Sequence, residues 1–140
     1  MSETLRRKAE QVSQLIRELT VEVEKGVPVI VEGKKDEYAL RSLAINGQII
    51  CVKNCRKNLA DIVYEIEEKG FKEIILLMDF DRRGREWTKR LNEHLEHAKI
   101  KSNVRFWRVL HGLVGHELKD IEGLPTYIVN LQKRIEIRKL

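Results

Sequence analysis

Residues 74–84 read IILLMDFDRRG, an apolar run that ends in two aspartates, two arginines and a glycine. Because the apolar residues do not alternate with polar ones, the run predicts a β-strand that is covered on both faces, as in a parallel sheet. Asp79 and Asp81 follow at the carboxyl end of this strand. In an extended chain they project to the same side, with roughly 7 Å between their α-carbons. Gly84 allows a tight turn before a helix that the spacing predicts over residues 85–99.

A second stretch of the same kind lies upstream, where residues 27–36 read VPVIVEGKKD. Here too a short apolar strand ends in an acid and a glycine, Glu32 and Gly33, with Asp36 three residues beyond the glycine. An isolated Asp-x-Asp pattern also occurs at helix caps and on solvated surfaces. Two acidic strand ends in one small sheet can converge, and that combination indicates a site for a hard cation.

These residues resemble a known family. Glu32-Gly33 with Asp36, followed by Asp79-Phe80-Asp81 with Gly84, is similar to the Toprim pattern shared by topoisomerases, bacterial-type primases, recombination mediators and the maturase of 5S ribosomal RNA. The chain resembles in particular the small stand-alone Toprim proteins of archaea and bacteria, and an archaeal protein is expected. The resemblance covers roughly residues 27–130 and implies an α/β, Rossmann-like Toprim fold.

The periodicity along the chain predicts alternating helices and strands. Tyr38, Leu40 and Leu43 are expected to face the core, and residues 111–116 are expected in a loop. The predicted helices span residues 3–24, 35–43, 59–69, 85–99 and 124–134, and the predicted strands span residues 27–31, 48–52, 73–78 and 104–110.

Strands separated by single helices predict a parallel four-stranded sheet flanked by helices. Because the two acid-bearing strands must be neighbours for their ends to converge, we expect the strand order 2-1-3-4. We divide the chain into an amino-terminal helix, residues 1–26, and a Toprim domain, residues 27–140, that includes the carboxy-terminal helix. The amphipathic first helix has two alternative partners for its apolar stripe, the sheet of its own chain and a second subunit in a homodimer.

Composition limits the class of protein. The chain has 140 residues, which is one domain's worth, and its net charge of +5 permits a nucleic-acid partner without requiring one. Cys51 and Cys55 are the only cysteines, too few for a disulfide scaffold or for a four-thiolate zinc site. No apolar run approaches the roughly 20 residues of a membrane span, and the first residues lack a signal-peptide core. We therefore expect a cytoplasmic protein without membrane contact.

The acids predict the metal and its ligands. Mg²⁺ prefers oxygen ligands and retains several waters, so a few carboxylates suffice, and Mn²⁺ is a similar alternative. We expect Asp79 and Asp81 to bind the ion, with Glu32 as a further ligand or as the general acid and base. In Toprim enzymes the glutamate that matches Glu32 has the proton-transfer role, and the aspartates that match Asp79 and Asp81 hold magnesium.

Basic residues are expected around this site, on loops and helix starts at the same sheet edge, where they would contact phosphates. They are Lys34, Lys35, Lys53, Arg56, Lys57, Arg82, Arg83 and Arg85. A charge-balancing surface is the alternative explanation for them. Auxiliary roles are expected for Asp36, Gly33, Gly84, His116 and Asp120.

Two functions fit this sequence. A topoisomerase needs a strand-passage gate and a separate tyrosine-bearing domain, for which 140 residues leave no room. One hypothesis is Mg²⁺-dependent chemistry on RNA or DNA phosphodiesters, as an RNA-processing endonuclease similar to the 5S maturase. The other is a non-catalytic RNA- or DNA-binding component of a larger assembly that retains the acidic site. Arg83 and Arg85 stand where topoisomerase-type motifs often have glutamates, which limits the transfer of that mechanism.

Overall fold

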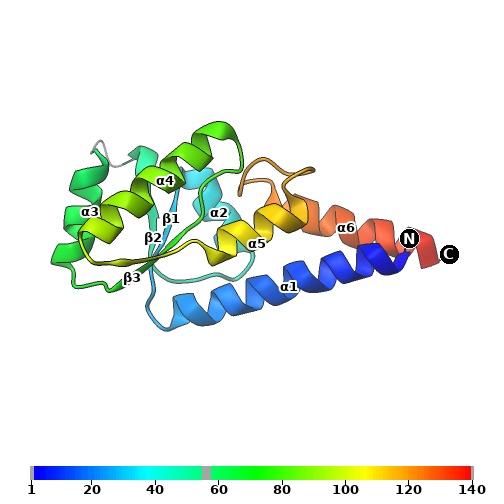
Figure 1. Ribbon diagram of the computed structural model, residues 1–140. Coiled ribbons are helices and arrows are strands. Elements are labelled where there is room, and N and C mark those ends of the chain that lie inside the picture. Colours follow the sequence, from blue (N-terminus) through cyan, green and yellow to red (C-terminus); the bar gives the residue numbers. More distant parts are fainter. Residues whose placement is uncertain (1, 55–57, 140) are drawn as a thin grey trace.

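The computed structural model describes residues 2–54 and 58–139, which form an α/β fold around a parallel sheet (Figure 1). Along the chain, the elements are α1 (Ser2–Glu24), β1 (Val29–Val31), α2 (Lys34–Ser42), β2 (Ile49–Cys51), the 3₁₀ turn η1 (Val52–Asn54), α3 (Leu59–Glu68), β3 (Glu73–Leu76), α4 (Arg82–His97), β4 (Lys101–Asn103), α5 (Arg105–Val114) and α6 (Leu124–Lys139).

The sheet has the predicted strand order, β2-β1-β3-β4, and all of its pairings are parallel. The central pair is β1 with β3, in which Val29 lies opposite Ile75. The pairing continues beyond the strand, because the Leu77 amide donates to the Ile30 carbonyl over 2.9 Å. The ends of the two acid-bearing strands are therefore neighbours, as the sequence predicted.

Helices cover both faces of the sheet, which explains why its central strands are continuous apolar runs. Successive residues of a strand point to opposite faces. Ile30 and Leu76 join α3 and α4 in one buried cluster. Val29, Val31 and Ile75 face the other way and pack with α1, α2 and α5. Each of these side chains of β1 and β3 is fully buried, so neither face of the two central strands is exposed at these residues.

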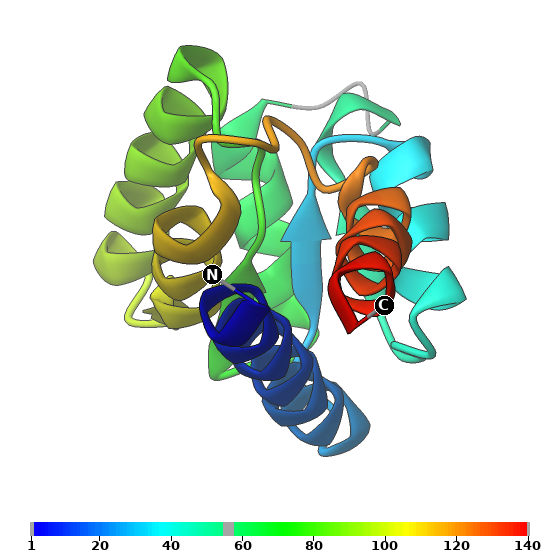
Figure 2. The same ribbon diagram turned by 90° about the vertical axis from the view of Figure 1, so that its right-hand side faces the viewer.

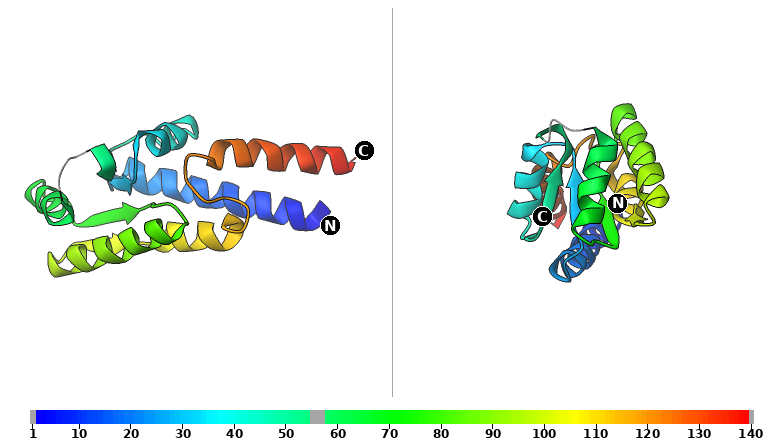
Figure 3. Two further views of the ribbon diagram at one scale, coloured as in Figure 1. Left: turned by 90° about the horizontal axis from the view of Figure 1, so that it is seen from above. Right: turned by 90° about the vertical axis from the view of Figure 1, so that its left-hand side faces the viewer.

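The amino-terminal helix packs within its own chain. Val12, Leu15 and Leu19 of its apolar stripe belong to the cluster on one face of the sheet. Nearer the amino terminus, Leu5 packs with Leu131 and Ile135 of α6. We call the portions of these two helices that project past the sheet the α1–α6 arm (Figures 1 and 3). Figure 2 views the protein from the end of this arm, where the start of α1 and the end of α6 lie close together.

The prediction of a strand over residues 104–110 is wrong. The fourth strand is the shorter segment Lys101–Asn103, and residues 105–114 form α5. Phe106, Leu110 and Val114 recur at helical spacing and are buried together, whereas a strand would have placed Arg108 on the same buried face as these residues. The Asn103 side chain accepts a hydrogen bond from the Arg105 amide at the start of the helix, over 3.1 Å.

Two smaller expectations are also corrected. His111 and Gly112, predicted in a loop, lie inside α5, and Gly115 caps that helix. Tyr38, predicted to face the core, is 65% exposed, whereas Leu40 is buried as expected. Among the described residues, no helix is both long and apolar enough to cross a membrane.

Candidate metal centre

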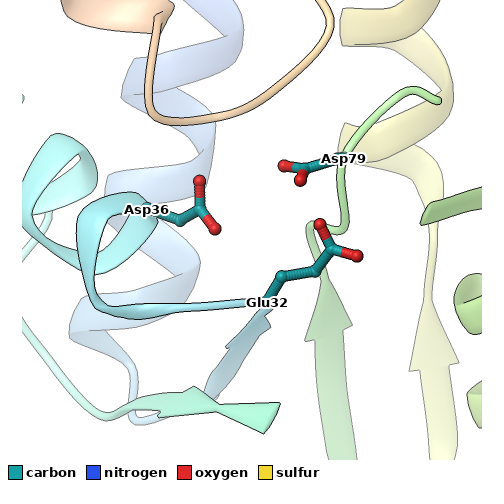
Figure 4. Close-up of side chains that lie close together, drawn as sticks. All are labelled: Glu32, Asp36 and Asp79. Atoms are coloured by element: carbon teal, nitrogen blue, oxygen red, sulfur yellow. The ribbon is translucent and has the colours of Figure 1, made fainter. Parts of the chain in front are cut away.

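Three carboxylates meet at the carboxyl edge of the sheet (Figure 4). Glu32 directly follows β1, Asp36 lies in the first turn of α2, and Asp79 follows β3. One oxygen from each side chain lies within 4.8 Å of the others. We call these three residues the acidic group. Their convergence follows from the strand order, because β1 and β3 are paired neighbours and both end at this edge.

Backbone amides hold Asp36 from two directions. The Gly33 amide donates to Oδ2 over 3.1 Å, and the Glu122 amide donates to Oδ1 over 3.0 Å. The first bond closes the turn from β1 into α2, as an acid at the third helical position commonly does. The second bond ties that turn to residues 115–123, a segment that we call the covering loop. Asp36 is thereby fixed in orientation and buried, with 7% of its surface exposed.

Asp79 is held by the same loop and by α5. The Ile121 amide lies 3.4 Å from its Oδ1 atom. The next residue, Phe80, donates its amide hydrogen to the Lys119 carbonyl over 2.7 Å. Before it, the Met78 carbonyl accepts a hydrogen bond from the Trp107 indole over 2.9 Å. Figure 4 shows the covering loop passing above Asp36 and Asp79.

The acidic group is electrostatically strained when no cation is bound. Burial raises the pKa of Asp79 to about 8, and the hydrogen bond and negative charge of Glu32 add to this effect. Burial and the charge of Asp79 also raise the pKa of Asp36, against the lowering effect of its two amide donors. Within the described part of the chain, no ion pair involves Glu32, Asp36 or Asp79.

This donor set fits a hard divalent cation. It consists of carboxylate oxygens alone, without histidine or thiolate, which is the set that Mg²⁺ and Ca²⁺ prefer. Burial and the neighbouring Glu32 carboxylate raise the pKa of Asp79, and a bound cation would offset this negative charge. Glu32, Asp36 and Asp79 are therefore the residues that would hold such an ion.

Comparison with known proteins decides the family. A profile of the Toprim domain matches residues 27–109. This chain belongs to the Toprim family. A UPF0292 protein of Methanocaldococcus jannaschii is 37% identical over 119 residues, which cover 85% of this chain and 91% of that protein. A UPF0292 protein of Methanosarcina acetivorans is 32% identical over 132 residues, covering 94% and 90% respectively.

A solved structure supports the same relationship. A putative protein from Aquifex aeolicus superposes with a TM-score of 0.65 at 28% sequence identity, covering 79% of this chain and 94% of that one. The relatives of this Toprim chain thus include proteins of archaea, in agreement with the predicted resemblance to small archaeal Toprim proteins. Membership of the Toprim family implies metal-dependent chemistry on nucleic acids.

The second aspartate of the Toprim pattern lies outside the acidic group. Asp81 is the amino-terminal cap of α4, and its Oδ1 atom accepts a hydrogen bond from the Gly84 amide over 2.7 Å. Asp81 is exposed, whereas Asp79 is half-buried. The helix begins at Arg82, three residues earlier than expected, and Asp81 is therefore its N-cap residue. Asp36, which the sequence suggested only as an auxiliary residue, occupies the third place in the group.

Gly84 is required by a close approach to Asp79. A β-carbon at Gly84 would lie 2.0 Å from the Asp79 carbonyl oxygen and 2.6 Å from its carbonyl carbon. Those atoms belong to the backbone and cannot rotate away. Gly33 caps α2 with an extended backbone, and nothing lies closer than 3.9 Å to its β-carbon position. Of these two glycines, only Gly84 is needed for space.

Exposed basic residues surround the acidic group on the helix starts. We call the described members of the predicted set the basic rim. They are Lys34 and Lys35 on α2, Lys53 on η1, and Arg82, Arg83 and Arg85 on α4. The remaining two predicted members, Arg56 and Lys57, lie outside the described residues. Arg82 pairs with Glu86 over 3.3 Å, and the Arg83 guanidinium lies 5.9 Å from the centre of the Trp87 ring.

The covering loop carries the two other predicted auxiliary residues. Asp120 accepts a hydrogen bond from the Gly123 amide over 2.8 Å, and its charge contributes to the raised pKa values of Asp36 and Asp79. His116 is exposed. The amides of Ile121 and Glu122, which orient the acidic group, could not be found from the sequence, because an amide hydrogen leaves no mark in the residue type.

The crowding at Gly84 gives the first prediction. Gly84→Ala should destabilise the fold by about 1–3 kcal/mol and displace Asp79, because the new methyl group overlaps backbone atoms. Gly112→Ala is the matched control, since Gly112 also lies in a helix but has nothing within 4 Å of its β-carbon position. It should stabilise the protein by up to about 1 kcal/mol. Chemical denaturation of both variants measures the difference, and equal effects would contradict the proposed crowding.

The pKa of Asp79 gives the second prediction. A folded-state pKa of about 8 against an ordinary value of 3.8 means that the folded protein binds this proton more tightly than the unfolded chain does. Without divalent cations, stability should therefore fall as the pH rises from about 4 to about 8. Asp79→Asn should remove most of this loss and raise the melting temperature at pH 8, by roughly 4 °C for each kcal/mol relieved. Thermal melts of both proteins from pH 5 to pH 8 test this, and parallel pH profiles would refute it.

Proposed function

We propose that this Toprim protein carries out Mg²⁺-dependent chemistry on nucleic-acid phosphodiesters, as an RNA-processing endonuclease. The acidic group is the observation that carries the proposal, because it gathers three carboxylates at a strand edge without a cationic partner among the described residues. Such a group costs folding free energy unless a cation occupies it. Binding of a metal ion at this group would offset that cost.

The three acids have separable roles in this proposal. Asp36 and Asp79 would bind the ion with oxygens that the backbone amides already orient. A bound Mg²⁺, or Mn²⁺ in its place, would offset the negative charge that develops on the phosphoryl group. Glu32 is 4% exposed and lies against Asp79. It would contribute an oxygen to the ion and transfer the proton at the reacting oxygen, as a buried carboxyl group can.

The basic rim would hold the substrate. Its ammonium and guanidinium groups stand on the first turns of α2 and α4 and on η1, around the ends of the strands that carry the acids. Phosphate contacts of this kind position a nucleic acid without reading its sequence. Affinity should then fall steeply with salt concentration. RNA is proposed over DNA because of the resemblance to the 5S maturase, and a cytoplasmic location fits such a substrate.

The non-catalytic alternative has one specific observation in its favour. Arg83 and Arg85 stand where topoisomerase-type Toprim motifs often have glutamates, so the rim is more basic than in those enzymes. A binding component of a larger assembly, including a homodimer, would need only the phosphate contacts. The same experiments separate the two functions, because a binding component has no turnover to lose.

Metal binding gives a third prediction. Mg²⁺ should raise the melting temperature of the parent protein, because the ion binds the folded state preferentially. Asp79→Asn should abolish this shift, since it removes a member of the acidic group. Asp81→Asn should retain it, because Asp81 caps α4 outside the group. If Asp81→Asn loses the response to Mg²⁺ as Asp79→Asn does, the ion binds the Asp-x-Asp pair in the way the sequence first suggested, and the role given to Asp36 is wrong.

Catalysis gives a fourth prediction. The parent protein should cleave short RNA in Mg²⁺ and fail to do so in EDTA. Glu32→Gln keeps the size of the side chain but removes a carboxyl group that can accept and donate a proton, so turnover should fall by roughly 10²–10⁴-fold while nucleic-acid binding persists. Cleavage and binding are measured side by side with RNA and DNA, in magnesium and in manganese. Cleavage at the parent rate in Glu32→Gln would exclude the proton-transfer role. A parent that binds but cleaves neither RNA nor DNA would favour the binding component.

A further inference from the structure

Tyr38 is an exposed aromatic side chain on the helix that carries Asp36. It is 65% exposed and belongs to neither of the clusters that cover the sheet. Asp36 on the same helix is buried, with its carboxylate in the acidic group. Tyr38 follows two residues later, about 200° further round the helix, and so faces solvent. The fold therefore gains little from a large ring at this position.

The neighbours of Tyr38 belong to the basic rim. Lys34 and Lys35 precede it by four and three residues, which are the spacings at which side chains adjoin on a helix surface. All three residues are exposed. The α-carbon of Tyr38 thus lies about one helical turn, roughly 5–6 Å along the axis, from the α-carbons of the two lysines at the start of α2. One surface presents phosphate-binding charge and a free aromatic face together.

The same spacing of a basic and an aromatic residue recurs on α4, although Trp87 is partly buried against the cluster on its face of the sheet. Arg83 stands in the first turn, and Trp87 follows it by four residues, with the Arg83 guanidinium 5.9 Å from the centre of the ring. Both helices begin at the sheet edge that carries the acidic group, one after β1 and one after β3. Each therefore pairs a basic first turn with an aromatic residue one turn later. These two pairs of a basic and an aromatic residue lie on α2 and α4, the helices that follow the two acid-bearing strands.

This combination selects for unpaired bases. Ammonium and guanidinium groups contact the phosphates of any nucleic acid, but an aromatic side chain can stack only on a base whose face is free. In a duplex the bases are already stacked on one another. We propose that the substrate of this site is single-stranded, and that Tyr38 stacks on an unpaired base of the strand whose phosphates Lys34 and Lys35 contact. This inference rests on the proposed function in one respect, that the ligand is a nucleic acid.

A second exposed tyrosine provides the internal comparison. Tyr64 on α3 is 62% exposed, much like Tyr38. The first turn of α3 contains Asp61 and no basic residue, and Tyr64 borders a groove shared with His94 and His97 of α4. Single exposed aromatic residues of this kind are ordinary on protein surfaces. The proposal therefore depends on the position of Tyr38 at the basic rim rather than on exposure alone.

Binding to matched single-stranded and duplex oligonucleotides tests the proposal. Fluorescence anisotropy is measured with labelled RNA and DNA in EDTA, so that no metal-dependent cleavage occurs. The parent should prefer the single strands. Tyr38→Ala should weaken single-strand binding by roughly tenfold or more and leave duplex binding unchanged. Tyr38→Phe keeps the ring and should bind like the parent, as should Tyr64→Ala. Thermal melts of the three variants check that the fold is retained.

The outcomes separate this inference from the proposed function. If Tyr38→Ala binds single strands like the parent, or if it loses single-strand and duplex affinity equally, the stacking role is overturned even where Mg²⁺-dependent cleavage is present. If the single-strand effect is found in a protein that cleaves nothing, the inference stands and the endonuclease proposal fails. A parent that binds no oligonucleotide at all would overturn the stacking role, whether or not Mg²⁺ alters its melting temperature.

Discussion

The mutual repulsion of three neighbouring carboxylates is the constraint on which the rest of this structure depends. Glu32, Asp36 and Asp79 are brought together where little water reaches them, and the pKa of Asp79 is raised to about 8 as a result. Backbone amides contact these carboxylates in place of cationic side chains. A lysine or arginine side chain inserted there would occupy the place of a metal ion. The amides of Gly33, Ile121 and Glu122 orient the carboxylates without neutralising them. The stability lost in this way is the kind of local cost that functional sites impose.

The strand order and one glycine determine how the backbone brings the three acids together. The acids meet only because β1 and β3 are adjacent, which is where an open parallel sheet has its crevice. The first turn of α4 must then pass close to the Asp79 carbonyl, and Gly84 is the residue that permits this approach. The helix starts at the same edge carry the basic rim. The turns that follow β1 and β3 thus position the acidic group and also begin the helices that carry most of the basic rim.

Much of this fold could be predicted because its signals are local. The uninterrupted apolar run before Asp79 identified a buried strand, and the need for two acidic ends to meet identified the strand order. The membership of the acidic group could not be derived in the same way. Asp36 and Asp81 both follow a strand end closely, and the choice between them depends on where each helix begins, which is uncertain by a few residues in any reading of a sequence. The failure at residues 104–110 has a similar cause, since a short apolar segment fits a strand or a buried helix until its packing partners are known.

The α1–α6 arm bears on how the protein is made. The apolar stripe of α1 is synthesised before α5 and α6, the helices that cover it. Leu5 in particular is covered by Leu131 and Ile135, which are synthesised more than 120 residues later in the chain. Contacts so distant in sequence form slowly, and an uncovered amphipathic helix is open to association in the meantime. The apolar stripe of α1 therefore stays exposed on the nascent chain until α5 and α6 have been synthesised.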